Sequence, residues 1–273
     1  MTRLLGDVVA RGTRSTVHAY GPGAVAKVPE PATPEGWIRY EAHYAEAARI
    51  AGAPAPRLLG LEQIDGRTAS IWEHLDGTSM WQLVVDRPER SAELGRLLAD
   101  LQNELFALVP PVTLPRQRDR LVSKIRRTAA TVDASFARAL AMMPPETGRP
   151  RLCHGDLHPS NVILGRDGPM LVDWFDAARG DPIADVARSS LTLLTDGTHP
   201  PEHLPGSDVA TLGALTDAYL ARLREHIDID DDLLARWQAV SAVARIAEGV
   251  SAGPLVDVWS RFQTVAETQA AAG

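Results

Sequence analysis

The chain has 273 residues, of which 45% are hydrophobic, and its formal net charge is −7. One cysteine excludes an internal disulfide framework, the acidic balance without a dominant Lys/Arg cluster argues against nucleic-acid binding, and no apolar run reaches the length of a membrane span. With no signal-peptide pattern at the start, we expect a cytoplasmic protein, a monomer or homodimer, without nucleic acid or membrane as a partner.

Short apolar runs in the first third predict a strand meander that is interrupted by one helix. The expected strands are 7–10, 16–20, 24–28, 57–61 and 68–72, and the expected helix is 34–51. Gly12 lies in the first connection, and Lys27 lies among apolar residues of the third strand. A buried lysine needs a partner, for which Glu41 and Glu46 are the candidates on the helix, whereas an edge-strand lysine would face water.

The second part of the chain is expected to be mainly helical. Leucines recur at steps of three and four from 94 to 108, with Asp86 as the expected N-cap and Pro88 in the first turn. Apolar residues between 121 and 140 repeat the pattern, and further helices are expected at 208–225, 231–250 and 254–268. The acidic run at 228–232 indicates either an acid-capped helix start or a patch that attracts an amine substrate.

The stretch from Cys153 to Asp185 carries the strongest chemical signal. A polar loop, 154–161, precedes two short apolar runs, 162–164 and 170–172, which are joined by the turn residues 165–168. Because a hairpin returns the chain to its start, Asn161 and Asp173 should become neighbours, close to Asp156. Two oxygen ligands beside a third carboxylate suit Mg²⁺ and phosphoryl transfer.

Two other interpretations of this loop stay open. His154, Asp156 and His158 alternate along the chain, which would also suit a zinc site of a hydrolase. An ordinary polar loop before a hairpin is the second alternative. Cys153 is interpreted as a small buried apolar residue.

The motif His154-Gly155-Asp156-Leu157-His158-Pro159-Ser160-Asn161, followed by Val172-Asp173-Trp174, resembles the aminoglycoside phosphotransferase and choline kinase family. The resemblance implies an α+β, two-lobed protein-kinase-like fold, with a nucleotide-binding N-lobe at 1–76 and a catalytic, acceptor-binding C-lobe at 77–273. Asp156 would be the catalytic base, and Asn161 and Asp173 would bind Mg²⁺. His154 would shape the loop, and Asp185, one turn into a helix that starts at Asp181-Pro182, would anchor it.

The resemblance also assigns the nucleotide site. The Gly12 loop would cover the phosphates of ATP, Lys27 would hold the α- and β-phosphates, and Glu41 would be its partner. Backbone groups from Glu73 to Leu75 would bind the adenine edge. The loop departs from the kinase pattern in having a single glycine, and Gln102 stands where the family often has a histidine.

We therefore expect an ATP- and Mg²⁺-dependent phosphotransferase that acts on a hydroxyl group of a small molecule. Aminoglycosides, other antibiotics, amino sugars and choline-like alcohols are the acceptors that the resemblance implies, which would include a resistance-type kinase. The acidic composition suits a cationic acceptor and equally suits plain solubility. A nucleotide-binding pseudokinase is the alternative.

Overall fold

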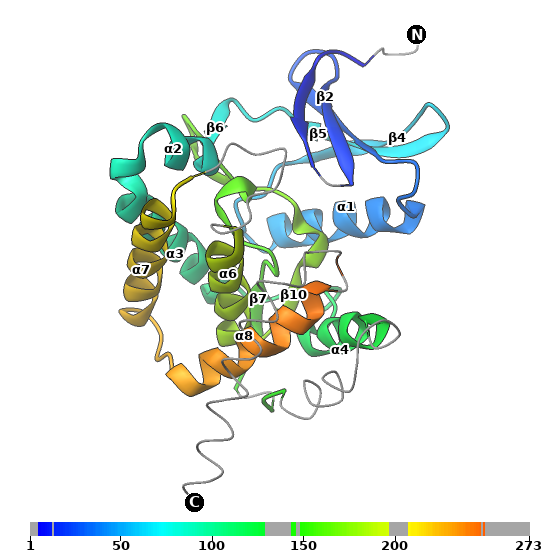
Figure 1. Ribbon diagram of the computed structural model, residues 1–273. Coiled ribbons are helices and arrows are strands. Elements are labelled where there is room, and N and C mark those ends of the chain that lie inside the picture. The colour runs from blue at the N-terminus through cyan, green and yellow to red at the C-terminus, as the bar shows by residue number, and fades with distance from the viewer. Residues whose placement is uncertain are drawn as a thin grey trace, which may run out of the picture.

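The N-terminal part of the molecule is an antiparallel sheet with one helix beneath it (Figure 1). The computed structural model describes residues 5–12, 14–128, 143–145, 148–196, 207–246 and 248. Within these residues, one five-stranded sheet has the order β1-β2-β3-β5-β4. Its strands are β1 (Val8–Arg11), β2 (Ser15–Ala19), β3 (Ala24–Pro29), β4 (Leu58–Ile64) and β5 (Arg67–Glu73), and α1 (Glu35–Ile50) connects β3 to β4.

Strand β3 shows how the alternation of side chains positions the site. Ala24, Ala26 and Val28 face one side of the sheet and join a small apolar cluster with Ile71 of β5. Because successive side chains point to opposite faces, Lys27 points to the other side, where it meets α1. The buried stripe of α1 contains one carboxylate among its apolar residues, and the stripe consists of Ile38, Glu41, Ala42, Ala45 and Ala48.

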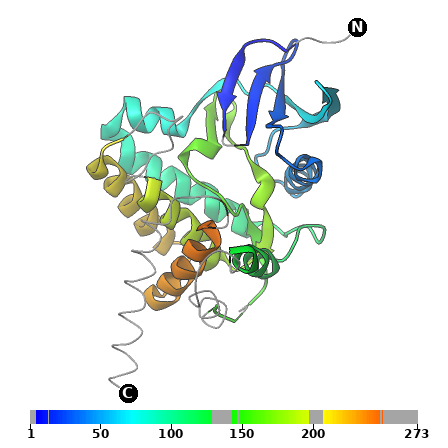
Figure 2. The ribbon, with the colours of Figure 1, turned by 45° about the vertical axis from the view of Figure 1, so that its right-hand side comes forward.

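The remainder of the chain is mainly helical, with short strand pairs between the helices (Figure 2). The described helices are α2 (Met80–Asp86), α3 (Ser91–Ala107), α4 (Gln117–Thr128), α6 (Pro182–Asp196), α7 (Val209–Arg224) and α8 (Asp231–Ile246). One small sheet pairs β6 (Gly77–Ser79) with β8 (Val162–Gly165) and β9 (Gly168–Leu171), and another pairs β7 (Arg151–Cys153) with β10 (Ala178–Gly180). The expected α+β, two-lobed arrangement is confirmed.

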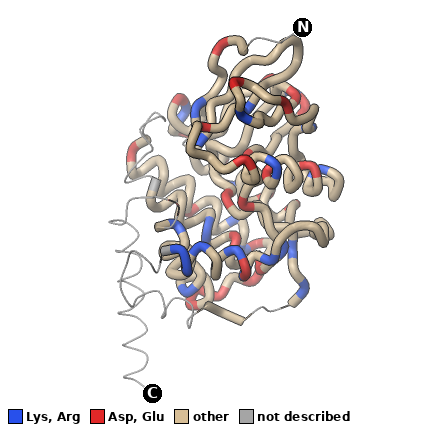
Figure 3. Tube along the Cα trace, turned by 90° about the vertical axis from the view of Figure 1, so that its right-hand side faces the viewer, with Lys and Arg blue, Asp and Glu red and all other residues tan. Residues whose placement is uncertain are grey.

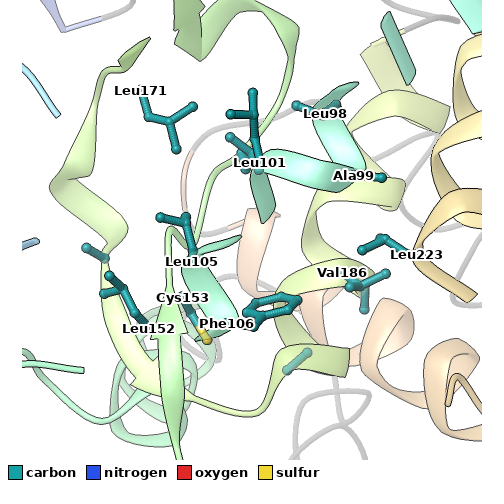
Figure 4. Close-up of a cluster of buried hydrophobic side chains, with 14 of the residues drawn as sticks. Leu98, Ala99, Leu101, Leu105, Phe106, Leu152, Cys153, Leu171, Val186 and Leu223 are labelled. Carbon is teal, nitrogen blue, oxygen red and sulfur yellow. The ribbon is translucent and has the colours of Figure 1, made fainter. Parts of the chain in front are cut away.

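Helix α3 is the centre of the main core (Figure 4). Its leucine stripe packs on β7 and β9 and on helices α6 and α7, and Cys153 is fully buried there as an apolar residue. A Cβ at Gly95 would lie 2.2 Å from the carbonyl oxygen of Leu215. Glycine at this position therefore lets α3 and α7 pack closely.

The expected cap at Asp86 is wrong, because Asp86 is the last residue of α2. Ser79 caps α2 by accepting a hydrogen bond from the Gln82 amide at 3.1 Å. Arg87 then leaves the helical conformation, and Pro88 begins a single 3-10 turn before α3 starts at Ser91. A seven-residue helix carries too little periodicity to be recognised in the sequence, and the same is true of the three-residue strands.

Other expected features are found with small shifts or lie outside the described residues. Asp208 caps α7, and in the acidic run Asp230 caps α8 by accepting a hydrogen bond from the Leu233 amide at 2.7 Å. The expected helix at 254–268, the apolar repeats from 132 to 140 and the expected continuation of α8 to 250 lie outside the described residues. In the part of the chain that is described, no helix combines the length and hydropathy of a membrane span.

Candidate active site

The β8–β9 hairpin brings the two expected metal ligands together. Val162 pairs with Leu171, and the Val172 amide donates to the Asn161 carbonyl at 3.0 Å, which places Asn161 beside the residue before Asp173. The hairpin is tied to the segment after α1, because the Leu171 amide donates to the Pro54 carbonyl at 2.6 Å.

Gly155 allows the polar loop 154–161 to approach the segment that follows the hairpin. It has a positive φ of 79°, and a Cβ there would lie 2.2 Å from the Asp176 carbonyl oxygen. A larger residue would suffer both a steric clash and an unfavourable backbone conformation. The position next to Asp156 therefore requires glycine for two independent reasons.

His154 supports the loop from inside. Its ring is fully buried, its Nδ1 accepts a hydrogen bond from the Asp156 amide at 3.3 Å, and its Nε2 lies 3.1 Å from the Val172 carbonyl oxygen. Burial lowers the pKa of His154 to about 4, so the ring is neutral and Nε2 carries the proton that it donates. Both nitrogens are thus occupied by the backbone, which leaves neither for zinc, and among the described residues no group of three or more His, Cys, Asp or Glu side chains is arranged to hold a metal ion.

Asp185 anchors the same loop from α6. The fully buried carboxylate accepts hydrogen bonds from the Gly155 amide at 2.8 Å, the His154 amide at 3.3 Å and Gln102 Nε2 at 2.9 Å. Gln102 is itself fully buried, and its Oε1 accepts a hydrogen bond from the Tyr219 hydroxyl. Burial outweighs these bonds and raises the pKa of Asp185 to about 6. Asp181 caps the start of α6, since the Ile183 amide donates to Asp181 Oδ1 at 2.8 Å.

Asp156 is held by a cation that the sequence analysis missed. Arg188 Nη2 donates to Asp156 Oδ1 at 2.9 Å. Burial acts to raise the pKa of Asp156. The charge of Arg188 and the hydrogen bond with His158 act in the opposite direction and outweigh burial, so the pKa lies well below its usual range. Asp156 is therefore ionised at neutral pH and can accept a hydrogen bond from a hydroxyl group. Arg188 follows Asp185 by three residues on α6, a spacing that puts both on one helix face and could have revealed it.

Lys27 joins carboxylates from the two parts of the molecule. Its Nζ lies 2.5 Å from Glu41 Oε1 and 3.4 Å from Asp173 Oδ1. Burial acts to lower the pKa of Lys27, but Asp173 and Glu41 raise it, and the net shift is upward. Lys27 is therefore a fixed positive charge. Glu46 pairs with Arg49 instead, at 2.7 Å.

Asn161 and Asp173 present oxygen atoms beside this lysine. Asn161 Nδ2 donates to the Asp156 carbonyl at 2.9 Å and lies 3.1 Å from His158 Nε2, which leaves Oδ1 as the oxygen available to a cation. Asp173 has a left-handed conformation with φ 64°, and about half of its side chain is exposed. Such a conformation is unusual for a residue other than glycine and is typical of functional sites.

The remaining expected nucleotide-site residues lie on the rim of the sheet. Gly12 follows β1, and its amide donates to the Ser15 carbonyl at 2.9 Å. The Glu73 and His74 amides are already paired with the carbonyls of Arg57 and Gly23. This leaves the backbone of Leu75 as the stronger candidate for contact with an adenine ring.

Comparisons with known proteins identify a family and a fold. The model of a family described as "Phosphotransferase enzyme family" matches residues 7–226, and no curated protein sequence matches the chain. A thermostable mutant of aminoglycoside phosphotransferase APH(4)-Ia, in ternary complex with AMP-PNP and hygromycin B, is 16% identical, with a TM-score of 0.65 over 95% of this chain and 92% of that one. An aminoglycoside-3'-phosphotransferase of type VIII is 20% identical, with a TM-score of 0.59 over 89% and 93%. A choline/ethanolamine kinase family protein from Mesorhizobium loti is 14% identical, with a TM-score of 0.58 over 94% and 86%.

Proposed function

This chain belongs to the phosphotransferase enzyme family, and we propose from that premise that it transfers the γ-phosphate of ATP to a hydroxyl group of a small molecule through Asp156. The observation that carries the proposal is the position of Lys27, which contacts Glu41 at 2.5 Å and Asp173 at 3.4 Å. One buried cation thereby links the sheet, α1 and the hairpin that follows the catalytic loop. We place the nucleotide-binding lobe at 1–76 and the catalytic lobe at 77–273.

Each residue has a defined role in this reaction. Lys27 would bind the α- and β-phosphates, held in place by Glu41, while Gly12 and the backbone of Glu73 and Leu75 would contact the nucleotide. Asn161 Oδ1 and the Asp173 carboxylate are hard oxygen donors that fit Mg²⁺. The ion, when bound, neutralises charge on the β- and γ-phosphates.

Asp156 acts on the acceptor. Its ionised carboxylate would accept a hydrogen bond from the substrate hydroxyl and align the hydroxyl oxygen with the γ-phosphorus. The new oxygen–phosphorus bond forms as the bond from the γ-phosphorus to the β,γ-bridging oxygen breaks, the hydroxyl proton passes to Asp156, and ADP leaves. A base with a low pKa suits a loose transition state, because the proton need transfer only late. His154 and Asp185 position the carboxylate by holding the loop.

The structural neighbours guide the choice of acceptors to test, and they are named as aminoglycoside phosphotransferases and a choline/ethanolamine kinase family protein. The experiment incubates the chain with MgATP and a panel of aminoglycosides, choline-like alcohols, amino sugars and hydroxy acids. Mass spectrometry then detects an added phosphate, with Asp156→Asn as the control. A chain that binds MgATP but phosphorylates no acceptor, and consumes ATP no faster than Asp156→Asn, would instead be a nucleotide-binding pseudokinase.

A further inference from the structure

A continuous series of ion pairs lies beside the catalytic loop. Among the residues that the structure describes, it joins three cations and three carboxylates, which are Arg120, Lys124, Asp156, Asp176, Arg188 and Glu248. Five of the six, all but Asp156, line one cavity together with Gly155. The cations come from α4 and α6, and acidic and basic positions are interspersed on the face of the molecule shown in Figure 3.

Five of the six groups have a role that the fold explains. Asp176 Oδ1 accepts from Arg120 at 2.7 Å and from Lys124 at 2.8 Å, which fixes the segment that Gly155 approaches. Arg188 holds the catalytic carboxylate of Asp156 at 2.9 Å. Glu248 is different, because it belongs neither to the catalytic loop nor to the helices that carry the cations.

The Glu248 carboxylate spans two of the cations. Its Oε1 lies 2.5 Å from Lys124 Nζ, and its Oε2 lies 2.9 Å from Arg188 Nη2. Its side chain is only 16% exposed. Asp185 also lines the cavity, but its carboxylate accepts hydrogen bonds from the His154 and Gly155 amides and from Gln102. Without Glu248, Arg188 would keep its ion pair with Asp156, and Lys124 would share Asp176 with Arg120. The position between Lys124 and Arg188 would then lose its negative charge, which is unfavourable for cations largely removed from water, so it suits an anion from the chain or from a ligand.

We propose that the acceptor carries an oxyanion, a carboxylate or a phosphate, which replaces the Glu248 carboxylate on Lys124 and Arg188 and so brings its hydroxyl group to Asp156. This inference rests on the proposed phosphotransfer and specifies its substrate class. A polycationic acceptor such as an aminoglycoside would set ammonium groups against Arg120, Lys124 and Arg188, which like-charge repulsion disfavours.

The geometry also limits the size of the acceptor. Asp156 Oδ1 and Glu248 Oε2 both lie 2.9 Å from the same Arg188 nitrogen, so they are at most about 6 Å apart. An oxyanion in place of the Glu248 carboxylate and a hydroxyl that is hydrogen-bonded to Asp156 are therefore at most about 9 Å apart, a span that a hydroxy acid or a sugar phosphate can bridge. Transfer itself is unchanged, with the hydroxyl proton passing to Asp156 and ADP as the leaving group.

The test compares probes that share a carbon skeleton and differ in charge. Calorimetric titration measures the binding of D-gluconate, D-glucose 6-phosphate, D-glucose and D-glucosamine to the full chain. In Glu248→Gln, where the neutral amide no longer neutralises Lys124 and Arg188, gluconate or glucose 6-phosphate should bind at least about tenfold more tightly than in the wild type. The more tightly bound of the two identifies carboxylate or phosphate as the preferred group.

Two further variants distinguish oxyanion binding at Lys124 from an effect of the protein's overall charge. Lys124→Met should weaken oxyanion binding about tenfold and leave glucose unchanged, because Asp176 keeps its bond to Arg120. Arg126→Met removes an exposed charge from the same helix and should change neither. Equal or tighter binding of glucose or glucosamine, or no binding of either anion to Glu248→Gln, would overturn the proposal.

The proposed function has its own readout in the same experiment. MgATP binding, and its slow hydrolysis dependent on Asp156, test the nucleotide half of the site without any acceptor. If both persist while the anions fail to bind, the substrate class is wrong and the phosphotransfer stands. If the wild type binds no MgATP, the proposed function itself fails.

Discussion

Replacing Asp185 by asparagine separates the electrostatic cost of this buried carboxylate from its role in holding the catalytic loop. One carboxylate oxygen accepts from the Gly155 amide, and the other accepts from the His154 amide and from Gln102. An asparagine NH₂ group on either side must face a backbone N–H. Gln102 can turn its own amide to compensate, but a backbone amide cannot, so about 1–3 kcal/mol is lost for the unpaired donor.

The change of the unfolding free energy with pH can be predicted more closely than the cost of the unpaired donor. The pKa of Asp185 is raised to about 6, so the folded protein takes up a proton before the unfolded chain does as the pH falls. The stabilisation that results from the raised pKa is therefore fully present below the pKa that Asp185 has in the unfolded chain, and it is lost as the pH rises through about 6. A shift of about two units corresponds to about 3 kcal/mol, of which about 2 kcal/mol accrues between about pH 7 and about pH 4.5.

The assay is urea unfolding of the wild type and of Asp185→Asn at several pH values between these limits. The wild type should gain stability relative to the variant as the pH falls. Asp100→Asn is the control, because burial raises the pKa of Asp100 but hydrogen bonds from Arg222 and His226 lower it below its usual value. The difference between wild type and Asp100→Asn should therefore stay nearly constant between these pH values, and the wild type should lose stability relative to this variant only at lower pH, below the unfolded pKa of the carboxyl group.

A difference between wild type and Asp185→Asn that stays constant with pH, or that shrinks as the pH falls, would refute the reasoning. It would mean that the three hydrogen bonds outweigh burial and that Asp185 is an ordinary ionised group. Turnover supplies a second readout, since a displaced Gly155 should lower kcat while MgATP affinity, which depends on Lys27 and Asp173, stays close to that of the wild type.

Three further predictions concern the reaction. Asp156→Asn should fold and bind MgATP but lose about 10²–10⁴ in kcat, and near-normal turnover would remove Asp156 from its role. Lys27→Ala and Glu41→Ala should each impair MgATP use, and the double variant should cost far less than the sum of the two; additive losses in kcat/KM would show that they do not act as a unit. Asp173→Ala should weaken Mg²⁺-dependent ATP binding more than Asn161→Ala does, because a carboxylate binds this cation more strongly than a neutral amide; titration of ATP against free Mg²⁺ checks this, and wild-type affinity in Asp173→Ala would contradict it.

Features encoded by neighbouring residues were predictable from the sequence. The hairpin formed where turn residues 165–168 join two apolar runs, and the cap at Asp181 lies directly before the proline that begins α6. The leucine stripe of α3 was found because its period is fixed by helix geometry. Asp86 was misassigned because α2 is too short to be recognised from its periodicity, so that its last residue was taken as the cap of the following helix.

Contacts between distant parts of the chain were not predictable in this way. Gln102 and Asp185 are 83 residues apart, and the partner of Asp156 on α6 is 32 residues away. Gln102, which stands where the family often has a histidine, is fully buried and bonds to Asp185, Ser189 and Tyr219. Only the folded chain shows that an amide, which donates and accepts at once, can link a carboxylate to a phenol at that position.

The arrangement around Lys27 also bears on how nucleotide binding would proceed. Its ammonium group has three donors, and the contact with Glu41 at 2.5 Å is much closer than that with Asp173 at 3.4 Å. Glu41 is buried, whereas Asp173 is about half exposed. A phosphate that approaches Lys27 would therefore displace the weaker, more exposed contact, and the released Asp173 carboxylate would become available to Mg²⁺. The ion pair between Lys27 and Asp173 would thus keep both side chains in position until MgATP binds, and the ion pair with Glu41 would keep Lys27 in position before and after binding.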